Sequence, residues 1–531
     1  MALFAAYFRG PNESRGQKGG RGNSNTVTTL RSNVRSQTDN GVRVCLSRKV
    51  FETTANQCGA DPIEQGLTIQ ALPNEILLEI FDCHRLLTLE TASSGFWVWH
   101  RLAHVCQKWR SIVFASPHRL DLRLVYTHGK PVRESVDCWP ILPISIWYPP
   151  TARLSREDEH NVVAALKYPD RIYEINLTLT RLLMAKSFSL LREPFPALER
   201  LQLRSHDSMG SLILPTAFLG GAAPRLRDIH LNSTAFPMLP HILLSAHELV
   251  SLRLDDIPNS GYISPDSFAA GLSVTTRLQF LKISFLFPMS RPNRRNTASS
   301  PRNHAVLPAL TDIQFRGDVD YLEDFVTRIN APSMERFDVT LFGQSPFNIP
   351  HLSEFIGRAK LLRSPHQTSI ELSEAEFTIT NDFRHSPPLP SPGNFKLLIS
   401  LDDVDLQMPT LVHVSRQLSS LLTSPERLDV ALSDFFPWPD PSEADTVHWL
   451  EFFRLFPGVK RLGVSSAVAS TVASTFEQVT ETTDILPSLR ELHMGGARAS
   501  TSQSIERFAS VRERSGYPDV SVYYQSGEFD S

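Results

Sequence analysis

Catalytic motifs depend on a few residue types at fixed spacings, and in this sequence those residue types do not fall at such spacings. Gly129-Lys130 is followed by Pro131, so the pair lacks the Ser or Thr of a phosphate-binding loop. His247-Glu248 lacks the second histidine, four positions after the first, that a zinc-hydrolase helix needs. No G-x-S-x-G occurs. We therefore expect no enzyme, although a triad assembled from distant segments stays open.

Metal-binding patterns are also missing. Asp402, Asp403 and Asp405 stand close together, but the remaining ligands of a calcium loop do not follow, so we interpret them as a solvated strand end. The cysteines are odd in number and form no C-x-x-C pair. They are Cys45, Cys58, Cys83, Cys106 and Cys138. We expect no metal, no cofactor and reduced thiols in a cytoplasmic or nuclear protein.

The composition indicates a folded protein of more than one domain. The chain has 531 residues, of which 41% are hydrophobic and 21% are charged. No apolar run reaches the roughly 18 residues of a membrane-spanning helix, so we expect no membrane contact. Residues 1–50 hold nine basic and two acidic side chains, a net charge of +7. The remainder holds 44 basic and 54 acidic side chains, a net of −10, which disfavours nucleic acid as a partner.

Residues 1–66 are rich in Gly, Ser, Asn, Arg and Thr and show almost no apolar periodicity, which predicts a disordered basic segment. Two alternatives stay open for it. An Arg- and Ser-rich, acid-poor start is also typical of a mitochondrial transit peptide. Residues 15–22 (RGQKGGRG) are also similar to RNA-binding segments of the RGG kind. We expect residues 526–531 to form a short tail.

Two amphipathic helices are predicted after this segment. The first opens at Leu72-Pro73 and runs to Phe81, with an apolar face at Ile76, Leu77, Ile80 and Phe81. A looser stretch follows, and then a second helical pattern from Trp97 to Phe114. Its apolar positions alternate steps of three and four, and Pro117 ends it. Periodicity alone also fits a plain helical hairpin, in which these side chains form only a core.

The two motifs together resemble an F-box. L-P-x-E-I-L-x-x-I-F spans Leu72 to Phe81, and L-x-x-V-C-x-x-W-R-x-I supplies Leu102, Val105, Cys106, Trp109, Arg110 and Ile112. The segment from Cys83 to Val98 is longer and more polar than the usual second helix of the family. A disordered start, an F-box and a long irregular remainder are similar to the large F-box families of fungi. The resemblance implies an all-α F-box domain at residues 67–117.

The resemblance also implies a partner, the Skp-type adaptor of a Skp–cullin–F-box ubiquitin ligase. A few buried apolar and aromatic side chains usually dominate such an interface. The residues that we expect to anchor the adaptor are Leu72, Pro73, Ile76, Leu77, Ile80, Val105 and Trp109.

A phrase of the form L-x-x-L-x-L recurs after Pro117. Its apolar triplets begin at Ile172, Leu198, Leu226, Leu249, Leu278, Leu310, Met334, Val459 and Leu489. Neighbouring copies start 23 to 34 residues apart, apart from a gap between 339 and 459 in which Ile370–Ile379, Phe395–Leu401 and Leu428–Leu432 read as further strands. The pattern resembles a leucine-rich repeat, one strand and one return segment per unit. We predict an irregular α/β solenoid over residues 118–525, with a plain hairpin in the gap.

Residues between the leucines of each strand should point to the opposite, concave face. They mix polar types and both charges, which suits recognition of a protein surface. The predicted target-binding residues are Gln202, Arg204, His230, Asn232, Arg253, Asp255, Lys282, Gln314, Arg316 and Asp338, with Ser284 and Thr340 beside them. A merely solvated strand face is the alternative.

The function that these expectations support is a substrate adaptor in ubiquitination. The F-box would dock the Skp-type adaptor, and the repeats would hold an unknown target protein near the conjugating enzyme. A repeat scaffold without a role in ubiquitination is one alternative. A hydrolase within the irregular 339–459 region is another, and a pocket with a perturbed His–carboxylate pair would support it.

Overall fold

The computed structural model describes most of the chain from residue 69 onward. The described residues are 69–91, 98–116, 119–120, 122–127, 142–148, 154–187, 189–205, 212–286, 304–342, 347–359, 362, 366–373, 376–382, 394–401, 403–422, 425–432, 443–479, 484–496 and 499–525. The chain divides into two units at Ala71 and Leu72, and only the 3-10 turn η2 (Ile69–Ala71) is described in the first. The predictions for residues 1–66 and for residues 526–531 lie outside the described residues.

Three helices form the first part of the second unit. They are α2 (Asn74–Thr91), α3 (Val98–Ala103) and α4 (Gln107–Ala115). Pro73 stands just before α2, and Glu75 in its first turn favours the helix dipole. The prediction of a looser stretch directly after Phe81 is wrong as far as Thr91. Helix α2 continues there, because no Gly or Pro interrupts the sequence before Gly95.

The single helix predicted from Trp97 to Phe114 is also wrong, because Cys106 divides it. Cys106 adopts an extended backbone with φ −156° and ψ 173°. Its sulfur accepts a hydrogen bond from the backbone N–H of Trp109 at 3.4 Å, as an N-cap residue does. The guanidinium Nε of Arg110 donates to the carbonyl of Ala103 at 3.0 Å, which satisfies the end of α3. Apolar spacing alone does not reveal such a break.

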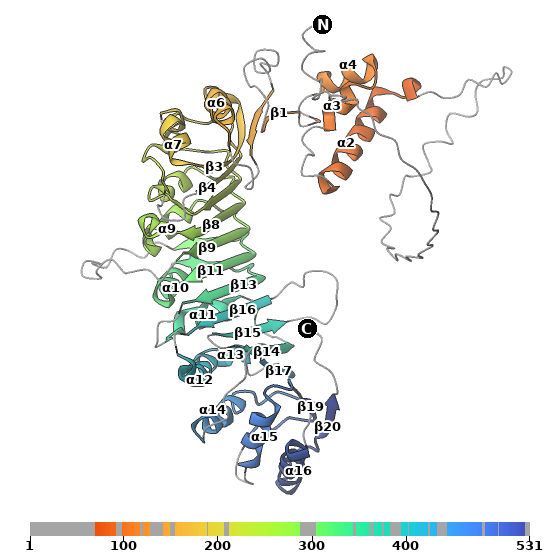
Figure 1. The fold of residues 1–531 in the computed structure, drawn as a ribbon, viewed down its shortest axis with the longest axis vertical. Coiled ribbons are helices and arrows are strands. Elements are labelled where there is room, and N and C mark those ends of the chain that lie inside the picture. Colours follow the sequence, from red (N-terminus) through yellow and green to blue (C-terminus); the bar gives the residue numbers. More distant parts are fainter. Residues whose placement is uncertain are drawn as a thin grey trace, which may run out of the picture. The chain divides into compact units, whose positions relative to one another are not determined.

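One large sheet organises the rest of the described chain (Figure 1). Its sixteen described strands are parallel except around β15. In spatial order they are β1 (Leu124–Tyr126), β2 (Ile144–Trp147), β3 (Ile172–Leu179), β4 (Arg200–Ser205), β6 (Asp228–Asn232), β8 (Ser251–Ile257), β9 (Phe280–Phe285), β11 (Asp312–Gly317), β13 (Arg336–Leu341), β16 (Asn394–Ser400), β15 (Glu376–Asp382), β14 (Gln367–Leu372), β17 (Arg427–Leu432), β18 (Arg461–Val464), β19 (Glu491–Gly495) and β20 (Ser521–Gln525). The α/β class expected from the sequence is confirmed.

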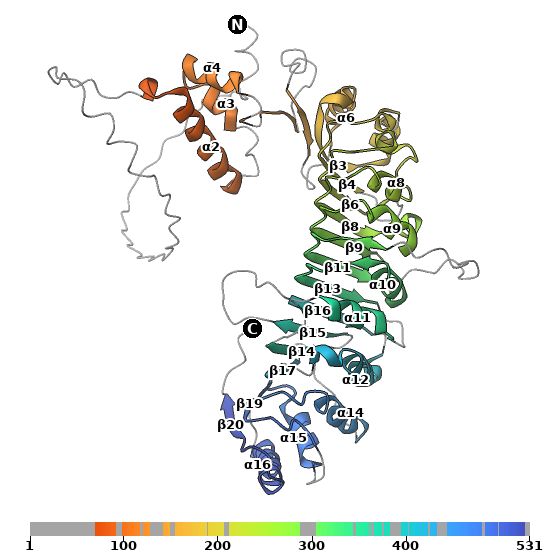
Figure 2. The same cartoon turned by 180° about the vertical axis from the view of Figure 1, so that it is seen from behind.

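Helices and short turns return the chain between strands and cover one face of the sheet (Figures 1 and 2). The helices are α6 (Arg156–Ala165), α7 (Arg181–Ser187), α8 (Leu239–Leu243), α9 (Pro265–Leu272), α10 (Val319–Val326), α11 (Pro350–Arg358), α12 (Gln407–Gln417), α13 (Ser419–Leu422), α14 (Glu443–Phe453), α15 (Ala469–Glu477) and α16 (Ala499–Arg514). Two small parallel pairs, β5 (Leu212–Ile213) with β7 (Thr234–Ala235) and β10 (Ala305–Val306) with β12 (Ile329–Asn330), form separate sheets. Ser264-Pro265 begins α9, because the Ser264 side chain accepts a hydrogen bond from the backbone N–H of Ser267 and Pro265 stands in the first turn.

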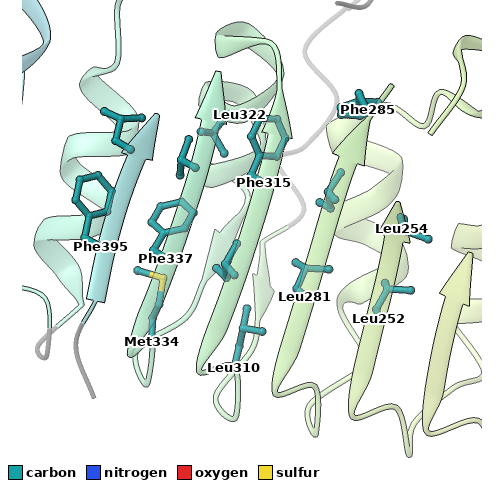
Figure 3. Close-up of a cluster of buried hydrophobic side chains, with 14 of the residues drawn as sticks. Leu252, Leu254, Leu281, Phe285, Leu310, Phe315, Leu322, Met334, Phe337 and Phe395 are labelled. Atoms are coloured by element: carbon teal, nitrogen blue, oxygen red, sulfur yellow. The ribbon is translucent and has the colours of Figure 1, made fainter. Parts of the chain in front are cut away.

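The recurring triplets form the core between sheet and helices. The second and third members pair in register from strand to strand, as Leu252 does with Leu281 and Ile313 with Phe337. All the triplet residues are buried. Figure 3 shows that their side chains share one face of neighbouring strands. A single unit has no second layer to bury this face, so each unit depends on its neighbours.

The irregular region reverses the order of three strands. Along the chain the three strands follow β13 in the order β14, β15, β16. In the sheet β13 pairs with the last of them, β16, whereas the first, β14, pairs with β17. β15 lies between β14 and β16 and is antiparallel to both. Gln407 of α12 stabilises the hairpin, because its amide nitrogen donates to the carbonyls of Ser373 at 2.7 Å and Glu376 at 2.9 Å. The expected hairpin is therefore confirmed, but the reversed order has no signal in apolar periodicity.

The two opposite faces of β13 provide a stability test. Phe337 is fully buried between Phe355 and Phe395, with ring centroids 5.8 and 6.2 Å away. We expect Phe337→Ala to lower the free energy of unfolding by about 3–5 kcal/mol. Thr340→Ala, on the opposite face of the same strand, should cost less than about 1 kcal/mol. Urea unfolding followed by circular dichroism measures both, and equal losses would contradict the one-sided core.

Candidate functional site

Two surfaces contain the predicted site residues, and the first is the outside of the three-helix unit. Ile76 and Ile80 lie one turn apart on α2 and are 42% and 39% exposed. Val105 lies in the turn between α3 and α4 and is 57% exposed. Aliphatic side chains at this exposure leave apolar area in water, which association with a partner would remove. We call these three residues the exposed apolar set.

Inside the unit, the same stripe of α2 forms a core. Leu77 and Phe81 are fully buried, and the Phe81 ring meets Trp109 edge to face at a centroid distance of 4.8 Å. Trp109 is 8% exposed. The expectation that Leu77 and Trp109 contact a partner is therefore corrected: both side chains are already used in the core of the unit. Leu72 is half-buried against that core, and Pro73 is exposed.

Polar contacts hold the exposed apolar set in place. Lys108 donates from Nζ to the carbonyl of Leu72 at 2.8 Å, which fixes the start of α2 against α4. Arg119 forms ion pairs with Glu79 and Asp82 of α2. Together with the Cys106 cap, these contacts set the position of the turn that carries Val105. The unit can therefore present these side chains without ordering them on binding.

The second surface is the face of the large sheet opposite the helices, which we call the open face. The structure places all ten predicted target-binding residues on it, and each is half-buried or exposed. Strand register aligns one row of side chains across neighbouring strands. That row contains Asn176, Gln202, His230, Arg253, Lys282, Gln314, Asp338 and Lys396.

Four side chains of the open face form a continuous hydrogen-bonded chain. His230 Nδ1 lies 2.7 Å from the amide nitrogen of Gln202, and its Nε2 lies 2.7 Å from Asp255 Oδ2. Lys282 Nζ reaches Asp255 Oδ1 at 2.7 Å. An amide nitrogen only donates, so Nδ1 accepts and Nε2–H donates to Asp255. Neither ring nitrogen is then free to act as a base, which disfavours a catalytic histidine here.

Asp255 and Asp338 differ electrostatically although both lie on the open face. Burial alone would raise the pKa of Asp255, but the hydrogen bonds from His230 and Lys282 outweigh it and hold that pKa below its ordinary value. Burial raises the pKa of Asp338, and the nearby charges of Arg336 and Lys396 offset this only in part. The ionised carboxylate of Asp338 therefore lowers the stability of the folded protein.

A hollow of about 480 Å³ opens beside this network, over β9, β11 and β13. Its polar lining includes Asn232, Asp255, Asp256, Lys282, Ser284, Gln314, Arg316, Asp338 and Thr340. Asp256 has φ +50° at a bulge of β8, which places its carboxylate at the rim. Spacing predicted most of these residues but missed Asp256, because a bulge breaks the alternation that the prediction used.

Aromatic rings also contact two arginines of the open face. The guanidinium carbon of Arg253 lies 4.6 Å from the centroid of Phe280, and that of Arg316 lies 5.4 Å from the centroid of Phe342. Phe280 and Phe342 were not among the residues predicted for the site. The sequence did contain a signal for them: each is an aromatic residue at a strand position where the repeat usually has a polar one.

The hydrolase alternative gains no support from the described part of residues 339–459. His413 there lies 2.7 Å from the side-chain amide of Gln417, and none of the residues that line the hollow is a histidine. Across the described residues, His, Cys, Asp and Glu do not gather in groups of three that can hold a metal ion. Nor is any described helix long and apolar enough to cross a bilayer.

The two carboxylates should respond to substitution with opposite signs. At pH 7, Asp255→Asn should lower the free energy of unfolding by roughly 1.5 kcal/mol, because an amide keeps only one of the two charge-assisted contacts. Asp338→Asn should raise it, because the neutral side chain removes the burial cost.

The pH dependence follows from the pKa directions. The stability that Asp255 contributes is present above the ordinary pKa of 3.8 and is lost as the pH falls through its lower folded pKa. The loss of stability caused by ionised Asp338 is present above the raised folded pKa of that group. It disappears below the ordinary pKa of 3.8. Urea unfolding at pH 7, 5 and 3.5 tests both, and effects of equal sign at pH 7 would contradict the assignment.

Comparison with known proteins bears on the three-helix unit. A family model described as F-box-like matches residues 69–120, which include α2, α3 and α4. Curated proteins give no significant match. Among solved structures, a Bacteroides fragilis protein from a structural-genomics programme is 9% identical over 82% of this chain and 86% of its own, but its TM-score of 0.20 supports no conclusion. The chain thus contains an F-box-like domain at residues 69–120, followed by an α/β repeat region.

Proposed function

We propose that this protein is a substrate adaptor of a Skp–cullin–F-box ubiquitin ligase. The observation that carries the proposal is that the F-box-like match covers the same three-helix unit that exposes Ile76, Ile80 and Val105. F-box domains in general bind Skp-type adaptors, so this unit would dock that adaptor.

The packing of the unit supports docking rather than a purely structural role. Its interior is already filled by Leu77, Phe81, Trp109 and Val113. The exposed apolar set is therefore not needed for that core. Burying such side chains against helices of a partner contributes about 1–2 kcal/mol each. Three of them, with the half-buried Leu72, are enough for a specific contact.

The open face would hold the target protein, and the repeats would contribute no chemistry. Its polar and charged side chains are fixed by strand register and by the network around His230, so they can recognise a surface with little ordering cost. Ubiquitination would then be promoted by proximity, because the bound target stays close to the conjugating enzyme. The engagement of both His230 nitrogens supports a role without catalysis.

Adaptor binding is the first test. In the full chain, Ile76→Ala/Ile80→Ala/Val105→Ala should weaken binding to the purified Skp-type adaptor by about a hundredfold, because each truncation removes roughly 1 kcal/mol of buried contact. Isothermal titration calorimetry measures the dissociation constant. The circular dichroism spectrum should stay unchanged, because these side chains lie outside the core.

A matched control uses aliphatic residues of similar exposure in the repeat region. Leu182, Leu244 and Val447 are 54%, 46% and 53% exposed. Their triple alanine variant should bind the adaptor as the parent does. Absence of binding by the parent chain, or an equal loss in both variants, would contradict the proposal. Adaptor binding without ubiquitination of any captured protein would favour a scaffold.

A further inference from the structure

The charges of the open face fall into two groups. The first group has polar or acidic neighbours. Arg204 donates to Asn176 Oδ1 at 3.3 Å, and Lys396 lies opposite Asp338 in the strand register. Other cations pair with a carboxylate on a neighbouring strand. These pairs are Arg200 with Asp228 at 3.7 Å, Lys282 with Asp255 at 2.7 Å and Arg336 with Asp312 at 3.4 Å. Such pairs neutralise each other and leave little net field for a partner.

Arg253 and Arg316 form the second group. Both are exposed, and each guanidinium lies over an aromatic ring, Phe280 and Phe342 respectively. Within the described part of the chain, neither forms an ion pair. A ring contacts the face of a guanidinium, so the N–H donors along its edge stay available. Each arginine is therefore a positioned cation whose charge is not neutralised.

The two arginines are spaced to contact one chain. Arg253 is on β8 and Arg316 is on β11, with β9 between them. Arg253 pairs with Lys282 in the register, and Arg316 pairs with Ser284, two residues further along β9. Two strand spacings and this offset place their backbones about 12 Å apart. An extended peptide advances about 3.3 Å per residue and alternates its side chains, so side chains four positions apart share one face and match this separation. The hollow lined by Lys282, Gln314 and Asp338 lies along that path.

We propose that the open face between β8 and β13 binds an extended segment of the target that carries two acidic side chains four positions apart. One carboxylate pairs with Arg253 and the other with Arg316, each by two parallel N–H···O bonds. The inference rests on the proposed function, because it names what the target surface presents to the repeats.

The carboxylates of the hollow restrict the residues between the two acidic positions. Asp256 and Asp338 line it, and Asp338 forms no hydrogen bond or ion pair with another described residue. A continuous run of negative charge would be repelled by both. The middle residues of the segment must therefore be neutral or basic. A nucleic-acid strand, with a phosphate at every unit, meets the same repulsion.

Fluorescence anisotropy with the full chain at low ionic strength tests the inference. The probe is a fluorescein-labelled twelve-residue peptide that carries Glu-Ser-Lys-Ser-Glu in a Gly-Ser background. We expect saturable binding that weakens about tenfold or more in Arg253→Gln/Arg316→Gln, because two charge-assisted pairs are lost. The same peptide with both Glu replaced by Gln should not bind.

Two controls separate this site from general electrostatics. Arg200→Gln/Arg336→Gln removes two arginines of the same face that already have carboxylate partners, and should leave peptide binding unchanged. Arg253→Glu/Arg316→Glu should instead bind the charge-reversed peptide Lys-Ser-Ser-Ser-Lys. Equal weakening in both glutamine variants, or tighter binding of an all-glutamate peptide, would overturn the inference.

Adaptor binding, measured on the same preparations, keeps this inference separate from the proposed function. Arg253→Gln/Arg316→Gln should bind the Skp-type adaptor as the parent does. A chain that binds the adaptor but not the Glu-Ser-Lys-Ser-Glu peptide overturns the inference alone. A chain that binds the peptide but not the adaptor supports the inference for the open face and contradicts the ligase assignment.

Discussion

One-sided burial of the apolar triplets is the constraint on which the repeat region depends. Each strand turns its leucines or phenylalanines toward the helices, and parallel register stacks them into continuous rows. Since no unit has a second layer of its own, the free energy of folding comes from contacts between neighbours. A strand out of register by one residue would bring polar side chains into that core, so register is strongly fixed.

The same register determines what the opposite face can do. Every second side chain must point away from the helices, and the side chains of neighbouring strands then stand about 5 Å apart. Several charges at that distance pair with one another, as in the chain of contacts from Gln202 through His230 and Asp255 to Lys282. Arg253 and Arg316 differ because their neighbours are rings, so their charge remains available to another molecule.

Alternation and helical spacing predict the elements that repeat, and they fail where one residue changes the geometry. The triplets located the parallel strands, since period two and burial on one face go together. The hairpin was foreseen, but the order β16, β15, β14 was not, because pairing partners distant in sequence leave no local pattern. The break at Cys106 was missed because apolar spacing runs through it.

The site residues divide in the same way. Position on the open face could be predicted from alternation, so Gln202, His230 and Asp338 were found. Asp256 was not, because its bulge shifts the alternation by one residue. On α2, a stripe at i, i+1, i+4 and i+5 did not tell core from surface. Packing against α4 buries Leu77 and Phe81 and leaves Ile76 and Ile80 outside. Only the three-dimensional arrangement makes that distinction.

The central claim is that the F-box-like unit, and not the repeat region, contacts the Skp-type adaptor. Hydrogen–deuterium exchange of the full chain, with and without the adaptor, measures this most directly. The account predicts added protection in the first half of α2 and around residues 104–106, with the strands from β3 to β20 unchanged. Protection confined to the repeat strands, or no change anywhere at saturating adaptor, would contradict it.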